Sequence, residues 1–264
     1  MPERMPVVAG RFYPAAPDAL QAEVRSYLAA GKSYSAAAPL DPSHAPSARL
    51  CGLMLPHAGY VFCGKVLGAT LASPWNGSSA GASLPERLII LCPNHTGRGA
   101  PLAVWPKGTW RTPLGSMPVD AEMATALCSA GGFVPDMQAH LDEHSLEVLL
   151  PFLQCLPPPQ GKEGATRSIT PVCVGTTHHK TLLQAGLAAL RDEIGAAHIG
   201  CQHGFFNELV RIVAGARHDL FDAAVFVADD LRLRGLEVHR AARLARPEQC
   251  AVHVVQVQQV VHAL

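Results

Sequence analysis

The chain has 264 residues, of which 48% are hydrophobic and 16% are charged, so it can bury a sizeable core. Its 21 basic and 21 acidic residues give a formal net charge of zero, which argues against nucleic acid or an anionic membrane as a partner. No apolar run approaches the length of a membrane span, and the N-terminus lacks the pattern of a signal peptide. We therefore expect a cytoplasmic protein.

The expected elements alternate between helices and short buried strands. An extended segment at 7–14 precedes an amphipathic helix that starts at Asp18. A second helix begins near Cys63. Stretches rich in Ser, Ala, Pro or Gly form loops at 32–48, 73–83 and 157–165. Apolar runs without alternation are typical of buried strands in an α/β sheet, and they occupy residues 50–55, 87–91, 102–105 and 169–174.

The eight cysteines are scattered and include no CxxC pair. In a chain of this length, we interpret them as reduced thiols in the core rather than as a disulfide framework. They stand at Cys51, Cys63, Cys92, Cys128, Cys155, Cys173, Cys201 and Cys250.

Two histidines each follow the end of an apolar strand. His57 comes after LMLP, and His95 comes after LIILCPN. Ligands of open α/β sheets bind beyond the carboxyl ends of the strands, so the two imidazoles can converge there. Neutral imidazole is a ligand for iron, copper and zinc. The alternative is that each histidine caps a turn. The pair His178-His179 also follows a strand end, but it fits the start of a helix equally well.

The segment 142–147 (DEHSLE) opens an apolar helical run. Asp142 is a candidate N-cap, with Glu147 in the first turn, and this alone explains the acidic residues. A carboxylate beside His144 can also orient that imidazole for proton transfer. His144 is therefore a candidate catalytic residue, and the alternative is a partly buried histidine at a helix start.

Six segments in a fixed order carry a resemblance to a known family. They read AGRFYP (9–14), PHAGY (56–60), CPNHTG (92–97), WRTPLG (110–115), EHSLE (143–147) and PVCVG (171–175). Over about residues 7–194 the chain resembles the Memo family, known in bacteria as protein B of the AmmeMemoRadiSam system. The resemblance implies an α/β single-domain sandwich with a mixed central sheet and flanking helices, similar to class III extradiol dioxygenases.

The resemblance also implies a metal site. The metal is iron(II), with copper as the alternative, and its first two ligands match His57 and His95. The same pocket then includes Tyr60, Asn94 and Glu143, next to His144.

The resemblance ends near residue 194. The family continues with a Ser-Ser-Asp…Ser-His segment and a later Cys-Gly segment that supplies the third metal ligand, and neither is present here. His198, Cys201 and His203 carry suitable donor atoms, but they do not match these segments. We therefore expect an incomplete Memo-like domain over 1–197 and a divergent tail over 198–264. Metal binding is expected to be impaired, because two ligands alone bind weakly.

The tail differs from the rest of the chain in composition. Ser, Thr, Lys, Tyr, Trp and Met are all absent from residues 198–264. Either the tail is a helix-prone extension, since 221–244 has helical spacing, or it results from a coding-frame error in a GC-rich gene. We favour the frame error. The family's segment includes a central strand, so apolar surface stays uncovered unless the tail packs there.

The sequence leaves functions of different classes open. One is a non-haem iron oxidoreductase, dioxygenase-like, in which His144 moves protons. The other is a metal- or peptide-binding module without turnover, and an inactive remnant is a third reading. Resemblance of fold does not transfer chemistry, and the small molecule or peptide that binds is not identified by the sequence.

Overall fold

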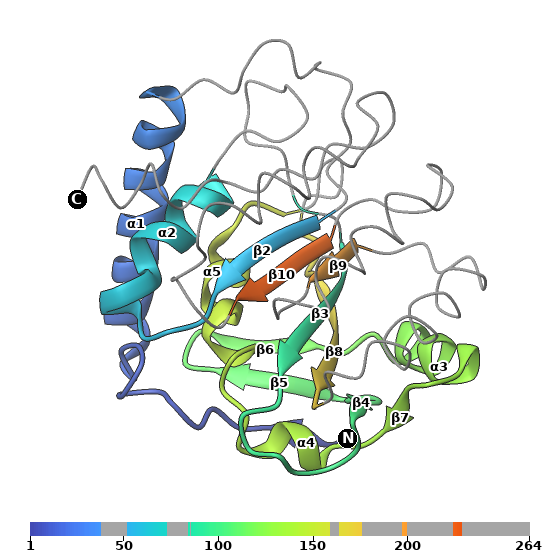
Figure 1. Cartoon of the computed structure of the whole chain (residues 1–264). Helices are drawn as coiled ribbons and strands as arrows, with labels where there is room; N and C mark the ends of the chain where they lie inside the picture. The colour runs from blue at the N-terminus through green and yellow to red at the C-terminus, as the bar shows by residue number, and fades with distance from the viewer. Residues whose placement is uncertain are drawn as a thin grey trace, which may run out of the picture.

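The computed structural model describes residues 1–37, 52–72, 84, 86–158, 164–175, 197–199 and 224–228 (Figure 1). The helices are α1 (Pro17–Ala37), α2 (Tyr60–Ala72), α3 (Ala121–Ala130), α4 (Gln138–Leu141) and α5 (Leu150–Cys155), with a 3₁₀ turn η1 (Glu147–Leu149). The strands are β1 (Glu3–Arg4), β2 (Gly52–Pro56), β3 (Arg87–Pro93), β4 (Leu102–Val104), β5 (Thr109–Thr112), β6 (Gly115–Pro118), β7 (Val134–Pro135), β8 (Ser168–Val174), β9 (Ala197–Ile199) and β10 (Ala224–Ala228).

The larger sheet is built from the apolar runs of the sequence. Within the described residues its strand order is β10-β2-β9-β3-β8-β4-β7. All neighbouring pairs are parallel except β4 and β8, so the sheet is mixed. β3 and β8 pair along their whole length and are buried at six of seven positions. Burial on both faces explains why these strands read as continuous apolar runs without alternation.

The N-terminal residues belong to a second, smaller sheet. β1 pairs in parallel with β5, and β5 pairs antiparallel with β6. The Trp110 ring of β5 is fully buried, and the guanidinium of Arg4 lies 4.6 Å from its centre. Arg4 therefore anchors the N-terminal segment to the core, while Met1 and Met5 of the same segment stay exposed.

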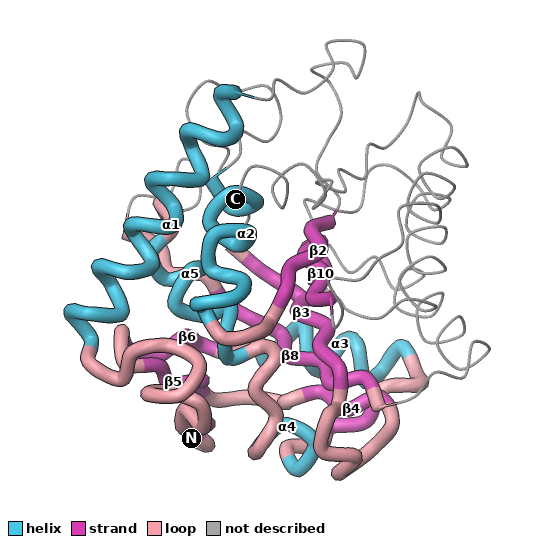
Figure 2. Tube along the Cα trace, turned by 60° about the vertical axis from the view of Figure 1, so that its left-hand side comes forward, coloured by secondary structure: helices cyan, strands magenta, loops and turns pink. Residues whose placement is uncertain are grey.

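Helices α1 and α2 pack side by side along one side of the larger sheet (Figures 1 and 2). The amphipathic character expected for α1 is confirmed, since Leu20 and Val24 are fully buried and Tyr27 and Leu28 are partly buried. Small residues let the two backbones approach closely: a Cβ atom added at Gly68 would lie 2.2 Å from the carbonyl oxygen of Tyr27. None of the helices in the described part of the chain is both long and apolar enough to cross a membrane.

Several local predictions were wrong. The loop expected at 32–48 starts later, because α1 continues to Ala37. Asp142 does not cap the helix that follows; it stands at the C-terminal end of α4 and pairs with Arg98 on the surface. The 3₁₀ turn η1 instead begins after Leu146 without a side-chain cap. Strands β1, β5, β6, β7 and β9 were not predicted, since each has only two to four residues and lacks an apolar run.

The tail contributes a strand where helical spacing was noted. Ala224–Ala228 forms β10, which pairs in parallel with β2 from Val225↔Leu53 to Ala228↔Pro56. The stretch AVFVA is rich in β-branched and aromatic residues, which favour strands. In the described residues, this part of the tail therefore joins the larger sheet beside the strand that leads to His57. The rest of 221–244 lies outside the described residues.

Candidate metal centre

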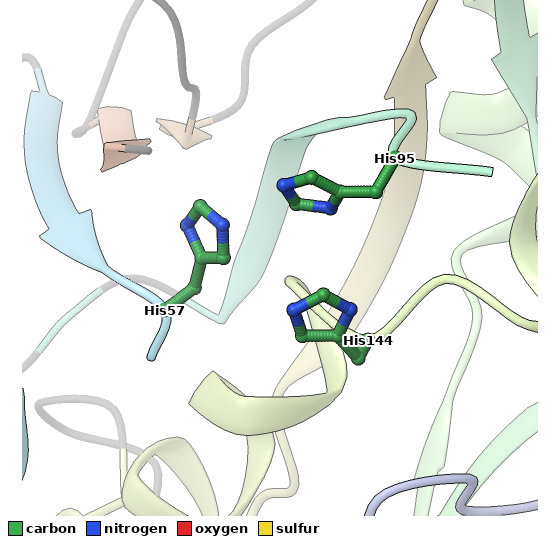
Figure 3. A group of neighbouring side chains, drawn as sticks. All are labelled: His57, His95 and His144. Carbon is green, nitrogen blue, oxygen red and sulfur yellow. The ribbon is translucent and has the colours of Figure 1, made fainter. Parts of the chain in front are cut away.

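Three histidines from different segments meet at one end of the larger sheet (Figure 3). His57 follows β2, His95 follows β3, and His144 lies between α4 and η1. The ring centres of His57 and His95 are 5.2 Å apart, those of His95 and His144 are 4.9 Å apart, and those of His57 and His144 are 5.9 Å apart. Parallel strands bring their carboxyl ends to the same edge, which is why residues so distant in sequence converge.

The carboxylate of Glu143 holds part of this histidine group in place through hydrogen bonds. Its Oε1 atom accepts hydrogen bonds from the His95 ring Nδ1 (2.8 Å), the backbone N–H of His144 (2.9 Å), and the backbone N–H (3.0 Å) and hydroxyl (2.8 Å) of Ser145. Its Oε2 atom accepts from the backbone N–H of His95 at 2.6 Å. Glu143 is completely buried. It therefore holds two of the three histidine segments in one place.

The charge state of Glu143 fixes the proton position on His95. Burial raises the pKa of the Glu143 carboxyl, but hydrogen bonds from the His95 ring and the Ser145 backbone, with the charge of His95, outweigh it and lower the pKa to about 2. An ionised carboxylate only accepts hydrogen bonds, so the His95 Nδ1 must carry the proton. When the ring is neutral, its lone pair is then on Nε2, the arrangement that carboxylate–histidine pairs adopt at metal sites, and when the ring is protonated the metal must displace the Nε2 proton.

The other two imidazoles differ in exposure. His57 is buried, with 5% of its surface exposed, whereas the His144 side chain is 23% exposed. The ring of Phe12 packs edge-on against His144, with the ring centres 4.8 Å apart. The His144 Nδ1 lies 3.5 Å from the Glu143 carboxylate. His144 therefore combines solvent access with a neighbouring acid, as does His95, whose side chain is 33% exposed and lies 2.8 Å from the same carboxylate.

The donor set fits a single metal ion. One donor atom of each ring lies within 4.8 Å of the other two, so a point no more than about 2.8 Å from all three exists, compared with about 2.0–2.1 Å for an imidazole–zinc bond. Side-chain shifts of less than about 1 Å would bring three nitrogens to bonding distance. Three imidazole ligands suit iron, copper and zinc alike.

Tyr60 and Asn94, which were assigned to the pocket, have structural contacts. Tyr60 is buried among aromatic rings, and its hydroxyl donates to the Val148 carbonyl at 2.8 Å. The Asn94 amide oxygen accepts from the Thr96 hydroxyl and the Gly97 N–H, both at 2.9 Å. Asn94 therefore shapes the turn that presents His95, while Tyr60 fixes the start of α2 next to His57.

Sequence reasoning missed the function of Glu147. This buried carboxylate pairs with Arg4 and accepts hydrogen bonds from the backbone N–H groups of Val7 (2.9 Å) and Val8 (3.0 Å) and from the Tyr13 hydroxyl (2.5 Å). It anchors the N-terminal segment, whose Phe12 touches His144. The signal available in the sequence was the acid itself, since a Glu in the middle of an apolar run needs a buried partner.

Other sequence candidates fall outside this description. His178, His179, Cys201 and His203 lie outside the described residues, and His198 lies in β9 without a described side chain. Of the site residues predicted from the sequence, the structure therefore brings together His57, His95, Glu143 and His144.

Two features define the class of protein. The fold is α/β with a mixed sheet, and a cluster of histidines lies at one end of that sheet. A family model described as "Memo-like protein" matches residues 4–193, and the chain belongs to this family. It is 39% identical over 191 residues to a MEMO1 family protein of Methanopyrus kandleri, an alignment that covers 70% of this chain and 61% of the relative. It is 35% identical over 186 residues to a MEMO1 family protein of Thermococcus onnurineus, covering 70% and 57%.

The chain matches these relatives over only part of their length. A MEMO1 family protein of Thermotoga neapolitana is 37% identical over 173 residues, which cover 65% of this chain and 57% of the relative. The chain thus spans about three fifths of the curated relatives it matches. The match to the family model ends at residue 193, close to residue 194, where the resemblance of the sequence to the family ends.

Proposed function

We propose that this chain binds one metal ion through His57 and His95. Iron(II) is the preferred metal, and copper is the alternative. The observation that supports this most directly is the hydrogen bond between the His95 Nδ1 and the Glu143 carboxylate, because it leaves Nε2 as the ring nitrogen that can bind the ion. His57 lies within reach of the same point. A ferrous ion held there would supply Lewis acidity and one-electron chemistry to a small molecule.

His144 is proposed as the group that moves protons at this centre. It is partly exposed, it stacks on His95, and its Nδ1 faces the Glu143 carboxylate at 3.5 Å. A carboxylate next to a partly exposed imidazole orients it for general acid–base work. In this role His144 serves a dioxygenase-like reaction on a small molecule or peptide, in a cytoplasmic protein.

A second candidate is a metal- or peptide-binding module without turnover. It is favoured by the partial coverage of the relatives, because the family's segments beyond residue 193 are not matched. In this case the metal would bind as proposed, while no oxygen would be consumed.

Metal binding tests the proposal. The full chain is titrated with Fe(II) under anaerobic conditions, beside His57→Ala, His95→Ala and His144→Gln variants. We expect one equivalent to bind to wild type and His144→Gln, and binding to be lost in the other two variants. Wild-type affinity in His95→Ala would refute the centre. A loss of affinity in His144→Gln would make this residue a third ligand instead of a proton carrier.

Turnover is measured separately. Oxygen uptake with a catechol probe in the Fe(II)-loaded protein, reduced at least tenfold in His144→Gln, is the result expected for the enzyme. Binding of Fe(II) without oxygen uptake would favour the binding module.

A further inference from the structure

A second group of metal-ligating side chains lies in the core, apart from the three histidines. Cys92 of β3, Cys173 of β8 and His140 of α4 are each fully buried, and one donor atom from each lies within 4.8 Å of the other two. Cys92 and Cys173 are paired directly in the parallel register of β3 and β8. Directly paired residues project from the same face of a sheet, so both thiols point toward α4.

The imidazole of His140 has one ring nitrogen available to bind a ligand. Its Nε2 lies 3.1 Å from the Ala103 carbonyl oxygen and donates to it. Burial lowers the pKa of His140 to about 4, so the ring is neutral and its lone pair is on Nδ1. Among the described residues, this buried Nδ1 atom has no hydrogen-bond partner. A buried acceptor without a partner is costly, and such cases call for an explanation such as a bound ion.

We propose that Cys92, His140 and Cys173 form a site for a thiophilic closed-shell cation, Zn²⁺, distinct from the histidine centre. A point no more than about 2.8 Å from all three donors exists, compared with about 2.3 Å for a zinc–sulfur and 2.0–2.1 Å for a zinc–nitrogen bond. Thiolate and imidazole are the ligands that zinc prefers in proteins.

The charges favour Zn²⁺ over Cu⁺. Two thiolates neutralise a divalent ion, so the filled site would bury no net charge. A monovalent copper ion with two thiolates would leave one negative charge in the core. The Cys173 Sγ lies 3.5 Å from the carbonyl oxygens of Pro93 and Ala139. The hydrogen bond to Cys92 and burial raise the pKa of the Cys173 thiol, so a bound cation must displace the thiol protons.

The surroundings hold the imidazole in place. The rings of Trp105 and Trp110 pack edge-on against His140, with centres 6.0 and 5.8 Å away. The Arg4 Nε donates to the His140 backbone carbonyl at 3.2 Å. The Ala103 carbonyl acts as the outer hydrogen-bond partner that orients a ligating histidine. Because two of the ligands stand on paired strands, the site is built on rigid elements.

Complete burial determines how the site must be loaded. An ion cannot reach these donors through the folded surface, so it enters while the chain folds or during local opening. The experiment therefore uses the full chain, refolded under reducing conditions with Co²⁺ as a coloured substitute for Zn²⁺. The chain carries His57→Ala and His95→Ala, so that the histidine centre does not compete.

We expect one equivalent of Co²⁺ to give a thiolate-to-cobalt charge-transfer band that is absent when Zn²⁺ is also present during refolding. Adding Cys92→Ala and Cys173→Ala should abolish the band, whereas Cys63→Ala, an equally buried thiol outside the cluster, should retain it. Absence of the band before the cysteines are changed would overturn the proposal, as would its survival in the Cys92→Ala Cys173→Ala variant.

X-ray absorption of the zinc-loaded protein gives a reading that does not depend on the cysteine variants folding. Two sulfur ligands and at least one nitrogen are expected. A zinc shell of nitrogen and oxygen alone would overturn the site. Retention of Cu⁺ but not Zn²⁺, with the same two sulfurs, would overturn zinc as the occupant.

Discussion

The replacement Glu143→Gln tests whether this carboxylate prepares His95 for a metal. The substitution preserves shape but introduces an NH₂ group. Four of the five hydrogen bonds converge on Oε1, so the amide oxygen must take that position. The NH₂ group then faces the His95 backbone N–H across the present 2.6 Å contact, and two donors oppose each other.

The magnitude follows from two contributions. Lowering the Glu143 pKa from 4.5 to about 2 corresponds to about 3 kcal/mol of folding stability. Because the folded-state pKa is the lower one, this contribution is complete above pH 4.5 and disappears as the pH falls toward 2. Loss of the outer partner of a ligating histidine typically lowers metal affinity by about 10- to 100-fold. Glu143→Gln should therefore lose about 3 kcal/mol of stability and at least tenfold in Fe(II) affinity.

Two measurements on the same samples check this. Denaturant unfolding with a chelator present gives the free energy of unfolding, and anaerobic competition with a coloured chelator gives the Fe(II) affinity. Asp120→Asn is the control, because this carboxylate pairs with Arg87 and caps α3. It should lose stability and keep its Fe(II) affinity. If Glu143→Gln bound Fe(II) as tightly as wild type, the argument that its carboxylate fixes the His95 tautomer would be refuted.

Three further outcomes follow from buried contacts. Glu147→Gln should destabilise the protein by about 3 kcal/mol in chemical denaturation, because the buried Arg4 loses its charge partner; a loss below about 1 kcal/mol would contradict the pairing. Gly68→Ala should lower stability by about 1–3 kcal/mol, since the added Cβ meets backbone of α1; unchanged thermal unfolding would show that the helices can move apart. His140 has its pKa lowered from 6.5 to about 4, so metal-free protein should be fully stabilised above pH 6.5 and lose about 3 kcal/mol as the pH falls to 4, with a flatter profile in His140→Gln.

The sequence alone was sufficient for the buried strands and for the convergence of His57 and His95, whose role as metal ligands stays a prediction. Strands covered on both faces must be apolar throughout, so β2, β3, β4 and β8 were visible as uninterrupted runs. The convergence of the two histidines followed from the rule that parallel strands end at one edge. β5 and β6 were missed because the sequence TWRTPLGSMP has no apolar run, and its burial comes from tertiary contacts of Trp110.

The remaining site features depend on register and on contacts distant in sequence. That Cys92 lies directly opposite Cys173 becomes evident only once β3 and β8 are aligned, since the two positions are 81 residues apart in the sequence (173 − 92). Asp142 was predicted as a cap because local rules favour an acid before a helix. The acid that the fold actually buries is Glu143, and its five donors come from His95 and from the turn itself.

One N-terminal side chain links both candidate sites. Arg4 donates to the backbone carbonyls of His140 and Glu143 and pairs with the Glu147 carboxylate, so it contacts three residues of the segment that also carries His144. Each of these contacts is buried, and charge-assisted hydrogen bonds of this kind are stronger than neutral ones. The segment's path, and with it the direction of two imidazoles, is therefore held by a residue more than 130 positions away in the sequence. The first strand thus belongs to the construction of the metal centre, although it supplies no ligand.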